Sequence, residues 1–205
     1  MNNKSIDINQ RIPLATLYAA LESYLNGLYS NDYVVEQLRL EFDGENRLKK
    51  ALRIVNKIVL KNPLNEFVLK NKDELIHALK KKGDRDIILI SLLNSAFPFS
   101  YDVLRILGKY LSVQDVISTE TIKRPIFNIY GGNRATDNGL YSVIPMFIEA
   151  NLFSRPKVGI YKKKEPLVLL TKISLEIYIK SFELNNTITE LRDHHRMDPY
   201  FIFVK

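Results

Sequence analysis

Cysteine and tryptophan are both absent from this chain of 205 residues. The missing cysteines exclude disulfides, thiolate zinc sites, iron–sulfur clusters and a cysteine nucleophile, and they favour a reducing, cytoplasmic location. Glycine and proline are sparse, at 8 residues each, which argues against a fibrous or disordered chain. Because hydrophobic residues make up 46% of the sequence, a chain of this length can bury a sizeable core without cross-links.

Long apolar runs are also missing. The longest nearly uncharged stretch covers residues 87–99, is too short to cross a bilayer and contains Asn94 and Pro98. The opening residues 1–11 have no apolar core of the kind that a secretory signal needs. We therefore expect a cytoplasmic protein without a membrane partner.

Negative charge is the scarcer sign, with 23 acidic residues against 30 Lys and Arg and a net charge of +7. Such an excess suits nucleic acid or another anionic surface. Residues 155–172 carry six cations against Glu165: Arg155, Lys157, Lys162, Lys163, Lys164 and Lys172. Residues 45–61 carry six against Glu45: Arg47, Lys49, Lys50, Arg53, Lys57 and Lys61. We predict that all six cations of the first group contact nucleic acid. Further contacts are predicted from Arg134 and, within the second group, from Arg47, Lys50, Arg53 and Lys57.

Apolar residues three or four positions apart predict a mainly α-helical protein. The expected helices cover residues 13–28, 31–41, 45–61, 63–69, 71–82, 85–96, 100–111, 136–152 and 171–184. The segment 85–96 is apolar nearly all round, which predicts a central position. Residues 113–128 are expected to hold one or two short helices that end near Arg124 and Pro125. Pro145 lies inside 136–152, where we expect a kink or a late start.

The C-terminal third has β character. Residues 158–161 and 166–170 flank a charged link, so we expect a hairpin whose tip carries Lys162, Lys163 and Lys164. Residues 200–204 are expected to form a strand at its edge. Helix 136–152 followed by this hairpin is the second half of a winged helix. We therefore predict a multi-helix domain over 1–130 and a winged-helix-like region over 131–205, with Gly131 and Gly132 as a turn.

This arrangement indicates double-stranded DNA as the partner, because a helix can enter the major groove while lysines of a hairpin lie along the phosphates. The exposed positions of helix 136–152 include Asn138, Tyr141 and Glu149, with Arg134 and Arg155 only on its flanks. Phosphate contacts should therefore dominate over base reading. Two other interpretations stay open: lysines that protect a strand edge from aggregation, and an adaptor that binds an acidic protein.

Catalytic motifs are lacking. There is no Gly-x-Ser-x-Gly, and the sequence after Gly132 lacks the Gly-Lys-Ser/Thr ending of a phosphate-binding loop. We predict a non-enzymatic protein with no cofactor. The one cluster with metal-ligand chemistry is Asp193, His194, His195 and Asp198. Neighbouring residues of a helix point about 100° apart, which disfavours a shared ion. A metal-dependent nuclease or hydrolase that uses these four residues remains the alternative.

Between residues 45 and 204 the sequence resembles the BrxA family of the bacterial BREX phage-exclusion systems. The resemblance lies in the basic segment 46–55, the helical segments 73–79, 86–93 and 99–105, the segment 140–152 and the ending Pro199, Tyr200, Phe201. It implies a largely helical fold, likened to that of the NusB antitermination factor. It also implies DNA binding and a role in antiviral defence beside other phage-defence proteins. It brings no catalytic residue.

Overall fold

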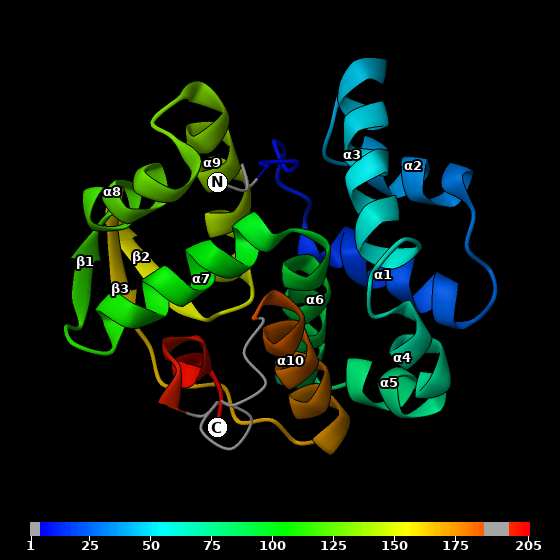
Figure 1. The fold of residues 1–205 in the computed structure, drawn as a ribbon. Helices are drawn as coiled ribbons and strands as arrows, with labels where there is room; N and C mark the ends of the chain where they lie inside the picture. Colours follow the sequence, from blue (N-terminus) through cyan, green and yellow to red (C-terminus); the bar gives the residue numbers. More distant parts are fainter. Residues whose placement is uncertain (1–4, 187–196) are drawn as a thin grey trace.

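The computed structural model describes residues 5–186 and 197–205 (Figure 1). Over these ranges the amphipathic segments form ten α-helices, and the prediction of a mainly helical fold with a small β element is confirmed. The helices are α1 Leu14–Leu25, α2 Asn31–Arg39, α3 Glu45–Val59, α4 Asn65–Lys70, α5 Lys72–Leu79, α6 Lys82–Ala96, α7 Pro98–Leu111, α8 Thr119–Tyr130, α9 Arg134–Glu149 and α10 Lys172–Asn185. The strands are β1 Val116–Ser118, β2 Phe153–Lys157 and β3 Ile160–Lys163, and a 3₁₀ helix, η3, covers Pro199–Phe203.

Helix α6 lies at the centre of the fold, as its all-round apolar sequence predicts. Every residue from Asp86 to Ala96 is buried. Helices α1, α3, α5, α7 and α10 all pack against it (Figure 1). Residues on both sides of the predicted boundary near 130 contribute to the core, and the division into two domains stays a prediction.

The N-terminal segment before α1 ties α3 to α9. Its residues Ile8 and Ile12 are fully buried. The Asp7 carboxylate lies 3.1 Å from the Lys57 ammonium of α3, and the Arg11 guanidinium lies 2.8 Å from the Glu149 carboxylate of α9. The same Glu149 accepts a hydrogen bond from the backbone N–H of Leu14 at 2.9 Å. Because the first N–H groups of a helix have no partner within it, this bond also caps α1.

Residues 98–163 have the element order of a winged helix: α7, β1, α8, α9, β2 and β3. The sheet is antiparallel with the strand order β1–β3–β2. Helices α8 and α9 are joined by residues 131–133, where Gly131 has a φ of 86° that favours glycine. Asn133 then caps α9 by accepting bonds from the N–H groups of Ala135 and Thr136. Helices α8 and α9 are thus joined by a short glycine-containing turn, and we call this pair the helix-turn-helix unit and the β2–β3 hairpin that follows it the wing.

The predicted hairpin boundaries are wrong. The hairpin turn lies at Val158 and Gly159, since Gly159 adopts a φ of 79°, and not at residues 162–165. Residues 167–169 pair with the C-terminal end of the chain: Leu167 N–H donates to the Phe203 carbonyl at 2.8 Å. The predicted strand over 200–204 is mostly the 3₁₀ helix η3, because Asp198 caps its start by accepting from Tyr200 N–H.

Residues 113–128 also differ from the expectation. Val116–Ser118 is a strand that pairs with β3, and α8 does not end near Pro125 but continues to Tyr130. A proline inside a helix removes one backbone hydrogen bond. The buried side chains Ile122 and Ile126 lie on either side of Pro125 and hold the helix on the core across it. Pro145 is likewise accommodated within α9.

None of the helices in residues 5–186 and 197–205 combines the length and the hydropathy that a membrane crossing requires.

Candidate nucleic-acid interface

Helix α9, the second helix of the helix-turn-helix, leaves a polar stripe exposed on its N-terminal half. Arg134, Asn138 and Tyr141 are exposed, and Tyr141 keeps 66% of its surface open. Their spacing of four and three residues puts them on one face. The opposite face buries Leu140, Val143 and Phe147 in the core. In helix-turn-helix proteins, the N-terminal residues of the second helix are the ones that contact base edges.

An ion pair joins the two helices of the motif beside this stripe. The Lys123 ammonium of α8 lies 2.8 Å from the Asp137 carboxylate of α9. The hydrogen bond to Asp137 raises the pKa of Lys123 above its ordinary value, so the ammonium stays charged. Lys123 also lies 5.9 Å from the ring centre of Tyr141. The acidic residue in the first turn of α9 is therefore neutralised next to the exposed stripe.

The wing brings two predicted contacts to the same unit. Arg155 and Lys157 of β2 are exposed and make no ion pair within the part of the chain that the structure describes. The turn at Val158 and Gly159 is fixed against the start of α8, because Thr119 N–H donates to the Gly159 carbonyl at 2.8 Å. Val158 itself is 85% exposed. The wing turn thus lies directly beside the helix-turn-helix.

The three consecutive lysines lie at the other end of the hairpin. Lys162 and Lys163 are exposed on β3, and Lys164 donates a hydrogen bond to the Asn151 side chain. They surround a hollow of about 590 Å³ together with Asp115 and Glu165. Two carboxylates thus lie among the three ammonium groups. Lys172 is exposed at the start of α10. The basic segment 155–172 therefore does not form a cationic hairpin tip.

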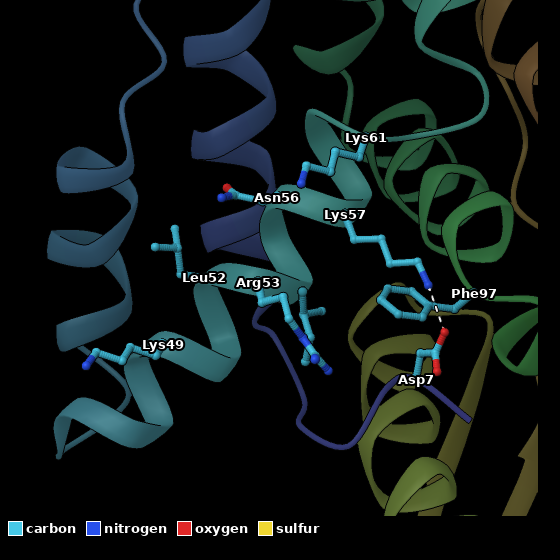
Figure 2. Close-up of a pocket in the computed structure, with 9 residues that line it drawn as sticks. Asp7, Lys49, Leu52, Arg53, Asn56, Lys57, Lys61 and Phe97 are labelled. Carbon is cyan, nitrogen blue, oxygen red and sulfur yellow. Dashed lines mark hydrogen bonds and ion pairs between the residues drawn. The ribbon is translucent and has the colours of Figure 1, made fainter. Parts of the chain in front are cut away.

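A second cationic surface runs along α3 (Figure 2). It is a groove of about 540 Å³ that is lined by Asp7, Lys49, Leu52, Arg53, Ile54, Asn56, Lys57, Lys61 and Phe97. Of the contacts predicted on this helix, Arg53 and Lys57 line the groove, whereas Arg47 and Lys50 are exposed outside it. Lys49 and Lys61 are not among the predicted contacts. Lys49 lies four residues before Arg53 and Lys61 lies four residues after Lys57, and this spacing is the sequence signal that indicates them.

The alternative metal cluster can be described only in part. Asp193, His194 and His195 lie outside the described residues. Asp198 accepts hydrogen bonds from Arg105 Nε at 3.1 and 2.9 Å and from Arg105 Nη2 at 2.7 Å, and it caps η3. Over residues 5–186 and 197–205, no three His, Asp or Glu side chains lie in an arrangement that could hold a metal ion. Asp198 therefore already has two structural partners.

No known family, curated protein or solved structure matches the chain.

Proposed function

We propose that this protein binds double-stranded DNA, without catalysing a reaction, through its helix-turn-helix and wing. The contacts come from five exposed side chains, here called the recognition surface: Arg134, Asn138, Tyr141, Arg155 and Lys157. The single observation that carries the proposal is the exposed stripe on α9. It lies where helix-turn-helix proteins contact bases, and the elements around it follow the order of a winged helix.

Phosphate contacts supply most of the binding in this proposal. Arg134 is the first residue of α9, where the positive end of the helix dipole also attracts an anion. Arg155 and Lys157 extend the cationic surface onto the wing. Asn138 is the side chain suited to read a base, because an amide can pair with the edge of adenine, and Tyr141 offers an apolar ring edge. Weak sequence preference follows from this composition.

The resemblance to the BrxA family supports a place in a bacterial phage-defence system of the BREX type. In that setting, binding to DNA would position other phage-defence proteins on it. Binding of an acidic protein partner through the same cations is the competing function, and the experiment below separates the two.

The variant Arg134→Gln, Arg155→Gln, Lys157→Gln should bind a random-sequence duplex more weakly and with less salt dependence. Loss of three phosphate contacts should reduce the slope of log affinity against log salt by about 2.7, because each contact contributes about 0.9. Fluorescence anisotropy across 50–200 mM salt measures this slope. If the intact protein neutralises about six phosphates in all, its affinity should fall on the order of 10³-fold over this range.

The matched control is Lys70→Gln, Lys80→Gln, Lys109→Gln, which removes the same charge at exposed sites outside both cationic surfaces. It should leave the slope nearly unchanged. Equal slopes for the two triple variants would contradict the proposal. Binding that an acidic polypeptide displaces but duplex does not would favour the protein partner.

A further inference from the structure

The α3 groove with its cations Lys49, Arg53, Lys57 and Lys61 is lined by α3, by Asp7 and by Phe97, and it shares no lining residue with the recognition surface. Figure 1 places α3 on one side of the molecule and α8 with the sheet on the other side. Helices α6 and α7 lie between them (Figure 1). A ligand in the α3 groove therefore meets a different part of the protein from a ligand on the wing.

The geometry of these cations fits a linear polyanion. Lys49, Arg53 and Lys57 lie four residues apart on α3, which gives a rise of about 6 Å for each step and about 12 Å over the three. Lys61 follows two residues after the helix ends at Val59. The step along the helix is comparable with the separation of neighbouring phosphates on one nucleic-acid strand. A site for one small anion needs cations that converge on a point, whereas these side chains are spread along α3 and the short segment that follows it (Figure 2).

The charge of the groove is poorly compensated. Asp7 is the one carboxylate among its lining residues, and it is paired with Lys57. Lys49, Arg53 and Lys61 make no ion pair within the residues that the structure describes. The acidic residue of α3, Glu45, is neutralised by Arg39 at 2.9 Å, outside the groove. Three cations thus remain to attract an anionic ligand.

The floor of the groove offers no platform for bases. Phe97 is its one aromatic lining residue, and it is only 2% exposed, with the Lys57 ammonium 4.5 Å from its ring centre. The Asn56 side chain is already bonded to Tyr29 and Asn31. Proteins that bind single strands stack bases on exposed aromatic rings, so this groove favours the backbone of a duplex.

We propose that the α3 groove is a second site for the phosphodiester backbone of duplex DNA, separate from the recognition surface. The proposal extends the function given above but does not depend on it, because each surface can be tested with the other one intact. A protein with two such surfaces makes two backbone contacts, and each contributes its own share of the salt dependence.

A pair of variants with equal loss of charge tests the second site. Lys49→Gln, Arg53→Gln removes two cations from the groove, and Lys70→Gln, Lys80→Gln removes the same charge from exposed positions outside both cationic surfaces. Anisotropy with a random 30-base-pair duplex over 50–200 mM salt is the measurement. The slope of log affinity against log salt should fall by about 1.8 for the groove variant and by less than half of that for the control.

The same pair of variants is then measured in the background Arg134→Gln, Arg155→Gln, Lys157→Gln. There, the duplex binding that remains should vanish with the groove variant and persist with the control. Equal slopes for the groove and control variants would overturn the second site, whatever the recognition surface does. Tighter binding of the single strand than of the duplex, lost with the groove variant, would also overturn it. An unaffected slope with the recognition variant alone would instead count against the function proposed above.

Discussion

Asp84→Ala should lower the free energy of unfolding by about 3 kcal/mol, because it leaves three partly buried hydrogen-bond donors without their acceptor. Asp84 is fully buried in the first turn of α6. Its Oδ1 accepts bonds from Thr171 N–H at 2.9 Å, from the Thr171 hydroxyl at 2.7 Å and from Leu170 N–H at 3.2 Å. Thr171 is the residue directly before α10. One carboxylate therefore joins the starts of α6 and α10, which pack together in the core.

The Asp84 contribution should depend on pH. Burial opposes ionisation, but the bonds from Thr171, Ser174 and Leu170 outweigh it, so the pKa of Asp84 is lowered in the folded protein. A carboxyl with a lowered pKa stabilises the fold above its unfolded value of about 3.9 and loses that contribution as the pH falls through the folded value. Urea unfolding at pH 7 and below pH 4 should show the difference between the intact protein and Asp84→Ala shrinking with acid.

Asp86 provides the matched control two residues along the same helix. It is also buried, and burial raises its pKa despite the ion pair with Lys82. A raised pKa means that the charged form costs stability at neutral pH, so Asp86→Asn should be neutral or stabilising there. A loss of similar size in both variants at pH 7 would contradict the role assigned to Asp84.

Tyr200→Ala should cost about 4 kcal/mol of unfolding free energy, which is typical of removing a fully buried aromatic ring. The Tyr200 ring stacks on Tyr178 with centres 4.3 Å apart and lies 4.9 Å from Tyr101. Its hydroxyl accepts from the Asn94 amide at 2.9 Å and bonds Ser181 at 2.8 Å. The C-terminal η3 is thereby fastened to α6, α7 and α10. Equilibrium unfolding in urea is the measurement.

Two variants separate the ring of Tyr200 from its hydroxyl. Tyr200→Phe keeps the ring but leaves the buried Asn94 amide without this acceptor, so it should cost about 1.5 kcal/mol. Tyr141→Ala makes the same change as Tyr200→Ala at an exposed site and should stay within about 0.5 kcal/mol of the intact protein. A cost for Tyr200→Ala no larger than that for Tyr141→Ala would show that η3 does not stabilise the fold.

Much of the helical fold could be predicted because amphipathic spacing is a local signal. The central position of α6 follows from its apolar sequence, and the turn at Gly131 and Gly132 follows from glycine chemistry. The hairpin was misplaced because the charged residues 162–165 resemble a turn more than Val158 and Gly159 do. Gly159, with its left-handed backbone, is the residue that decides the position.

The remaining errors come from contacts between distant parts of the chain. Val116–Ser118 is too short to show alternation, and it is a strand because β3 pairs with it. The basic character of α3 is evident in the sequence, but its groove is not. The groove also needs Asp7 and Phe97, which packing brings against α3 from about 50 and 40 residues away. Spacing within one helix cannot reveal such partners.

Cleavage of DNA from a reagent attached to α9 tests the central claim most directly. Because the chain has no cysteine, Asn138→Cys gives a single attachment point for an iron chelate that cuts nearby DNA through hydroxyl radicals. Lys72→Cys, on the exposed surface of α5, is the matched control. If α9 lies against the duplex, the Asn138→Cys conjugate should cut a labelled duplex and the Lys72→Cys conjugate should not. Equal cutting from both positions, or cutting from Lys72→Cys alone, would contradict a recognition surface on the helix-turn-helix.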